Sequence, residues 1–294
     1  MITEQEFLAL AAQGHNRIPL VAQALADLDT PLSLYLKLTQ GQPNSFLLES
    51  VVGGERFGRY SFVGLPAHTL IRATGRQVEV VTDGQIVETF SGNPLDFIEA
   101  YQARFKVALR PGLPRFCGGL AGYFGYDAVR YMEPRLAKTQ KTGGLDTPDV
   151  QLLQCEELAV IDNLSGKLYL IVYADPAQPE AYTRAKKRLR DLKEQLKYSV
   201  SAPVVKATES HPAQRDFAKA DYLAAVERAK ELIAAGDFMQ VQVGQRIHKR
   251  YTESPLSLYR ALRSLNPSPY MYFYDFGDFH VVGASPEILV RQEK

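Results

Sequence analysis

The stretch that decides the fold is residues 266–291, which read NPSPYMYFYDFGDFHVVGASPEILVR. Two apolar runs, Tyr270–Phe276 and Phe279–Gly283, flank Gly277-Asp278, and residue pairs of this kind favour a tight turn between strands. The pattern therefore predicts an antiparallel hairpin. A further short strand is expected at Ile288–Arg291, where apolar residues follow one another again.

The residues just before this hairpin predict two helices and one strand. Ala220–Ala235 carries apolar residues on one helical face, and Gly236 is well placed to end that helix in a left-handed conformation. Phe238–Ile247 alternates apolar and polar residues, which is typical of a strand with one exposed face. Pro255–Ser264 is predicted as a short helix.

Farther towards the N-terminus the same rules predict more strands than helices. Strands, helices and hairpins alternate without a regular βαβ rhythm, which indicates an α+β fold with mainly antiparallel sheets flanked by helices. The expected helices are Thr3–Leu10, Pro94–Lys106 and Glu180–Tyr198; the expected strands are Leu32–Leu38, Ser45–Val52, Tyr60–Val63, Thr69–Ala73, and the hairpins Gln77–Val81 with Gln85–Phe90 and Glu157–Ile161 with Lys167–Tyr173.

Composition excludes several classes of partner. The 294 residues carry a net charge of +1, which favours neither nucleic acid nor an anionic membrane. Two cysteines, Cys117 and Cys155, cannot form a disulfide framework, and they fit a reduced, cytoplasmic compartment. Ser199–Arg215 is polar and contains two prolines, so we expect a linker there, with domains at residues 1–205 and 206–294.

Generic catalytic motifs do not identify a function. The five histidines are scattered and show no pairing typical of a metal site, so no metal ligands are assigned. The glycine-rich stretch Gly118–Asp127 lacks the lysine and the spacing of a phosphate-binding loop, and its glycines are expected to mark strand bends or close backbone approach.

Three longer stretches, taken together and in order, resemble anthranilate synthase component I. They are residues 46–65, with Leu47-Leu48-Glu49-Ser50, residues 237–247, and the residues 266–291 quoted above. The resemblance implies a chorismate-binding fold and a reaction that turns chorismate and ammonia into anthranilate and pyruvate with Mg²⁺. It also implies a partner subunit, a glutamine amidotransferase that supplies the ammonia, and feedback inhibition by L-tryptophan.

The same resemblance implies a tryptophan site between two of these stretches. Ser50 would bind the charged head of the amino acid, with Glu49 helping to position it, and Pro269, Tyr270 and Met271 would line the other side. Met and Tyr make good contacts with an aromatic ring, and prolines hold a segment rigid before binding. The alternative is that Ser50 merely ends a buried strand and that Tyr270 and Met271 are core residues.

Two catalytic residues are also implied. Glu287 resembles the general acid of chorismate-using enzymes, a role that requires burial to raise its pKa. Gln240 stands where related enzymes that use water carry a lysine, and a glutamine there fits ammonia as the nucleophile. The alternative for Gln240 is a polar side chain on an exposed strand face.

The glutamates that bind Mg²⁺ in the family have no counterpart in these 294 residues, so we expect the chain alone to be inactive. Two other interpretations remain open. One is the sister enzyme aminodeoxychorismate synthase, and the other is a module that only binds tryptophan for regulation.

Overall fold

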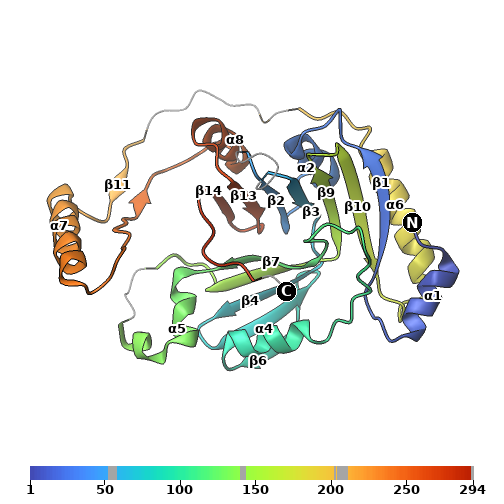
Figure 1. Ribbon diagram of the computed structural model, residues 1–294, viewed down its shortest axis with the longest axis horizontal. Coiled ribbons are helices and arrows are strands. Elements are labelled where there is room, and N and C mark those ends of the chain that lie inside the picture. The colour runs from blue at the N-terminus through green and yellow to red at the C-terminus, as the bar shows by residue number, and fades with distance from the viewer. Residues whose placement is uncertain (52–57, 140–143, 202, 204–210, 293–294) are drawn as a thin grey trace. The chain divides into compact units, whose positions relative to one another are not determined.

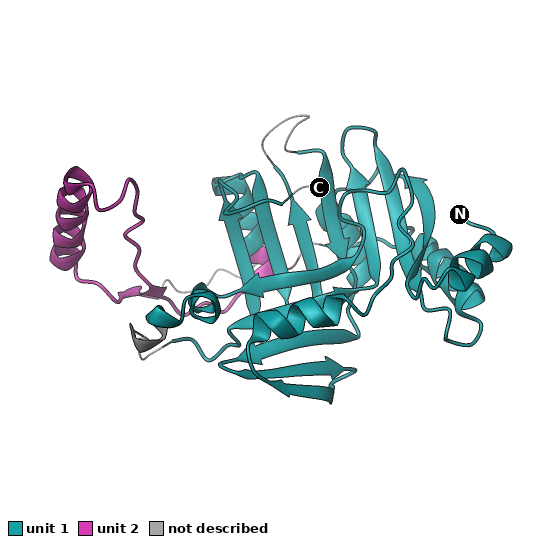
Figure 2. Cartoon of the chain, turned by 60° about the horizontal axis from the view of Figure 1, so that its bottom comes forward, with its two compact units in different colours: residues 1–202, 258–294 teal, residues 203–257 magenta. Residues whose placement is uncertain are grey.

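The computed structural model describes residues 1–51, 58–139, 144–201, 203 and 211–292. Contacts divide the chain into two compact units: Met1–Ala202 together with Leu258–Lys294, and Pro203–Ser257 (Figure 2). The domain division between residues 205 and 206 stays a prediction about the whole protein.

The first unit contains a seven-stranded sheet in which all neighbours are antiparallel. Its order is β1-β10-β9-β3-β2-β13-β14. The two strands nearest the C-terminus, β13 and β14, therefore pair onto β2 from the N-terminal part of the chain, as Figure 1 shows. The strands are β1 (Ile18–Leu25), β2 (Ser45–Glu49), β3 (Tyr60–Gly64), β9 (Glu157–Asp162), β10 (Lys167–Ala174), β13 (Tyr270–Asp275) and β14 (His280–Ser285).

A five-stranded antiparallel sheet, ordered β6-β5-β4-β8-β7, packs against one face of the first. Phe46, Leu153, Val160 and Ile171 belong to the apolar core between the two sheets, which we call the inter-sheet core. The strands are β4 (Thr69–Thr74), β5 (Gln77–Thr82), β6 (Gln85–Ser91), β7 (Gly119–Phe124) and β8 (Val150–Cys155).

Helices cover the outer faces of both sheets. On the seven-stranded sheet, α2 (Pro31–Thr39) and α8 (Pro255–Leu265) place the rings of Tyr35 and Tyr259 5.6 and 5.9 Å from that of Phe273. The long helix α6 (Ala181–Gln195) lies on β1 and β10, and α4 (Pro94–Gln102) covers the second sheet. Unit 1 is thus a helix–sheet–sheet–helix sandwich, and the α+β class is confirmed.

The second unit contains α7 (Lys219–Ala235), ended by Gly236 at φ 85° as predicted. A two-residue ladder joins β11 (Gln214–Arg215) to β12 (Ile247–His248). The remaining elements, all in unit 1, are α1 (Glu4–Ala12), α5 (Val129–Met132) and two 3₁₀ turns at Tyr126–Ala128 and Pro134–Thr139. No helix of the described part of the chain combines the length and the apolar character needed to cross a bilayer.

Three predicted strands are wrong. Leu32–Leu38 lies in helix α2, because Thr30 caps the helix in a reciprocal pair with Ser33 and Pro31 opens its first turn. Phe238–Ile247 and Ile288–Arg291 are not strands, apart from Ile247 in β12. Alternation is not sufficient, since a strand also needs a neighbour to pair with.

The predicted hairpins are confirmed, including the turns at Asp83-Gly84 and Gly277-Asp278. The capping box of the first helix is present, with Thr3 and Glu6 each accepting a hydrogen bond from the other's backbone N–H. Val52 and a part of the predicted linker 199–215, namely residues 202 and 204–210, lie outside the described residues.

Candidate functional site

The ladder between β2 and β13 brings together two segments that are far apart in the sequence. Met271 lies opposite Glu49 and Phe273 lies opposite Leu47, both in antiparallel register. Past the end of β2 the two segments stay side by side but out of register, since the Val51 N–H donates to the Ser268 carbonyl at 3.1 Å where the ladder would place Pro269. The tryptophan-site segments predicted from the sequence are therefore neighbours in space.

Strand alternation separates the candidate residues into two faces. Phe46 and Leu48 of β2 belong to or pack on the inter-sheet core, and Ser50 comes directly after the last residue of the strand. Tyr270 shares this face, because Tyr272 and Tyr274 two and four residues on also belong to or pack on that core. Tyr270 thus lies on the inter-sheet side, and Ser50 directly follows the last paired residue of β2, so both residues stand at the end of the β2–β13 ladder.

Burial differs among these residues. Ser50, Pro269 and Tyr270 are half-buried, as expected for side chains at the rim of a core. Met271 is only 1% exposed and lies with Glu49 on the face covered by α2 and α8. The structure places Met271 in the core, and its contact with a ligand stays a prediction.

Glu49 is part of a buried polar cluster that the sequence did not predict. Its side chain is 2% exposed and accepts hydrogen bonds from Tyr259 Oη at 2.5 Å and from Arg263 Nε at 2.7 Å. Burial raises the pKa of Tyr259, and the adjacent carboxylate raises it further, so this hydroxyl remains a donor. Tyr259 and Arg263 are four residues apart on α8, so they lie on one face of the helix. The sequence does not say that this face packs on Glu49.

The two predicted catalytic residues lie in different units, and each is described within its own. Glu287 is exposed and follows β14, where the Ser285 hydroxyl donates to the Glu287 backbone carbonyl at 2.8 Å. Gln240 is exposed in the irregular segment between α7 and β12. Neither has the burial that a group at a reacting centre requires.

The described residues do not fit a Mg²⁺ ion. Magnesium prefers near-octahedral oxygen ligands, usually with carboxylates among them. Within the ranges that the structure describes, no group of three or more His, Cys, Asp or Glu side chains could hold a metal ion. No step through Mg²⁺ is therefore derived for these residues.

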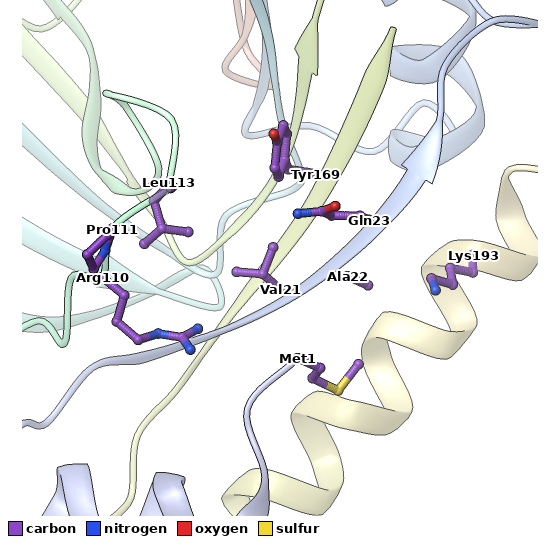
Figure 3. A pocket seen from close by; sticks show the side chains of 10 residues that line it. Met1, Val21, Ala22, Gln23, Arg110, Pro111, Leu113, Tyr169 and Lys193 are labelled. Carbon is purple, nitrogen blue, oxygen red and sulfur yellow. The ribbon is translucent and has the colours of Figure 1, made fainter. Parts of the chain in front are cut away.

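A hollow of about 490 Å³ lies beside β1, and Figure 3 shows the side chains that line it. Val21, Ala22 and Gln23 of the edge strand β1 line it, together with Tyr169 of the neighbouring strand β10. Arg110 and Lys193 contribute positive charge to its lining. None of the residues predicted to bind tryptophan or to act in catalysis contributes to it.

Comparisons with known proteins show which family the chain is similar to. The model of a family described as chorismate binding enzyme matches residues 43–294. Over its full length the chain is 57% identical to anthranilate synthase component 1 of Neisseria gonorrhoeae, and over 99% of its length it is 51% identical to that of Pseudomonas aeruginosa. It spans 60% of the length of each of these relatives.

A solved structure gives the same result at the level of the fold. The crystal structure of anthranilate synthase component I from Streptococcus pneumoniae aligns with 90% of this chain at a TM-score of 0.61 and 28% identity. The aligned part is 57% of that chain.

Proposed function

The chain belongs to the family of chorismate binding enzymes, and from this premise we propose that it is part of the large subunit of anthranilate synthase. The whole protein converts chorismate and ammonia to anthranilate and pyruvate. A partner glutamine amidotransferase supplies the ammonia, and L-tryptophan inhibits the reaction. Residues 1–205 form the regulatory domain, and residues 206–294 begin the catalytic one.

The observation that carries the tryptophan site is the placement of Ser50 and Tyr270 together at the end of the β2–β13 ladder. A free amino acid needs a few polar partners for its charged head and an apolar slot for its side chain. Ser50 supplies a hydroxyl, and Tyr270 with Pro269 supplies an apolar wall. The aromatic inter-sheet core begins next to them, with Tyr272 and Phe62 among its partly buried rings.

In the chemical step, Glu287 acts as the general acid that protonates the leaving hydroxyl of chorismate. This requires a site that excludes water and raises the carboxyl pKa. Gln240 carries an uncharged amide that cannot deprotonate water near neutral pH, which fits ammonia as nucleophile. Both side chains are exposed in the described chain, so further residues have to cover them before either acts.

The test is a titration of the chain with L-tryptophan, after circular dichroism has established that it is folded. The chain contains no tryptophan, so the ligand is the only indole in solution and its own fluorescence reports binding. Ser50→Phe is expected to abolish saturable binding. Ser91→Phe, at the exposed end of β6 in the other sheet, is the matched control and should bind like the unchanged chain.

Absence of binding to the folded, unchanged chain would contradict the proposal that these residues form the regulatory site. Equal binding by the Ser50→Phe variant would place the site elsewhere.

A further inference from the structure

The carboxylate of Glu49 is buried, and two side chains of helix α8 donate hydrogen bonds to it. Its side chain is 2% exposed, and burying a charged group is costly unless hydrogen bonds and an opposite charge compensate. Tyr259 donates from a residue that is itself 0% exposed. Arg263 donates through both Nε and Nη2, at 2.7 and 3.2 Å.

The hydrogen bonds from Tyr259 and Arg263 therefore hold the end of β2. Glu49 is the final residue of the strand, and Ser50 follows it directly. Holding Glu49 against α8 fixes the position and direction of the backbone that leads into Ser50. Beyond Glu49 the strand is tied to its neighbour by the hydrogen bond from Val51 N–H to the Ser268 carbonyl.

We propose that Tyr259 and Arg263 are positioning residues for the amino-acid site, acting through the Glu49 carboxylate to fix the direction in which Ser50 presents its hydroxyl. They contact no ligand themselves. Their contribution is pre-organisation, because a strand end that is already ordered loses less conformational freedom on binding. This inference rests on the proposed function, since it concerns the same L-tryptophan site.

Two variants test the inference with L-tryptophan as the probe. Tyr259→Phe keeps the ring in the core and removes only the hydroxyl, and it is expected to weaken tryptophan binding about tenfold. Arg263→Gln removes the charged partner of the Glu49 carboxylate and should weaken binding in the same direction, with urea unfolding used to check that the variant is folded.

The control is Tyr101→Phe in α4. Tyr101 is also buried, and its hydroxyl donates to Gln154 at 2.6 Å, on the second sheet. Both Tyr→Phe variants should lose stability in urea unfolding, and Tyr259→Phe should lose more because its hydroxyl donates to a carboxylate whereas that of Tyr101 donates to an amide. Only Tyr259→Phe should change the dissociation constant for tryptophan, which separates positioning from a general loss of stability.

A double-mutant cycle shows whether Tyr259 acts through Ser50. In a Ser50→Ala background the Tyr259→Phe change should weaken binding less than about twofold, because coupled residues are not additive. Full additivity would overturn the inference, as would unchanged binding by both Tyr259→Phe and Arg263→Gln while Ser50→Ala weakens it. If the unchanged chain does not bind tryptophan, the proposed function fails and the inference fails with it.

Discussion

The backbone carbonyl of Gln151 occupies the space that a side chain on Gly122 would need. A β-carbon built on Gly122 would come within 1.9 Å of the Gln151 oxygen, far inside van der Waals contact. The two residues belong to adjacent strands, β7 and β8, whose register pairs Gly122 with Leu152. The close backbone approach expected for a glycine of residues 118–127 is thus present at this position.

Gly122→Ala is expected to destabilise the chain by about 3 kcal/mol or more, because one of two packed strands has to shift. Gly144→Ala is the matched control, since a β-carbon on Gly144 would meet nothing within 4 Å. It should change stability by less than about 0.5 kcal/mol. Urea unfolding followed by circular dichroism measures both, and equal midpoints would contradict the expected clash.

Glu49→Gln is expected to cost about 1–3 kcal/mol of unfolding free energy. The charge that Arg263 and Tyr259 hydrogen-bond is lost, while the Tyr259 hydroxyl stays buried. Glu227→Gln, in a pair with Lys230 whose side chains are 68% and 65% exposed, should cost less than about 0.5 kcal/mol. Chemical denaturation of the two variants measures the two losses of unfolding free energy. Equal losses would contradict the expectation that burial makes the Glu49 contacts the more stabilising.

Cys155 makes stability fall at alkaline pH. Burial raises the pKa of its thiol from 9.0 to about 12, so between these values the unfolded chain has lost a proton that the folded chain retains. Stability therefore decreases as pH rises above 9, with a slope of up to about 1.4 kcal/mol per pH unit from this group. In Cys155→Ala this part of the slope should vanish between pH 9 and 11, as measured by denaturation at each pH. An unchanged slope would assign the effect to other groups.

The 294-residue chain is expected to form no anthranilate from chorismate, Mg²⁺ and ammonium. Glu287 is exposed, and the described residues hold no group of acidic side chains fit for the metal. The product's fluorescence gives the assay, with the relative from Pseudomonas aeruginosa as a positive control. Detectable anthranilate above a blank without protein would contradict this expectation.

Local sequence determined the elements whose stabilising contacts are local. Asp83-Gly84 forms its turn because both residues take positive φ, 49° and 80°, which this pair tolerates well. Thr3 and Glu6 cap the first helix within one turn of chain. The stripe of α6 was visible because Ala185, Leu189 and Leu192 recur at helical spacing, and all three are buried.

Two strand predictions were wrong because they relied on the pattern of apolar residues alone. The apolar run 32–38 fits a strand as well as a helix, and the cap at Thr30 followed by Pro31 was the signal that distinguishes them. Residues 238–247 alternate as a strand does, but only Ile247 pairs with a neighbour among the described residues. Alternation of apolar and polar residues shows which side chains favour solvent. A strand forms only where a second strand pairs with its backbone N–H and C=O groups.

The sequence by itself determined the family, the α+β class and which segments belong to the candidate site, since these follow from residue order and local pattern. Only the tertiary structure decided that Glu49 and Met271 share the face covered by α8, because strand register sets the face. It also decided that α8 holds the Glu49 carboxylate across 210 residues of sequence. Such a contact depends on where a helix docks, and helical spacing alone does not specify its partner.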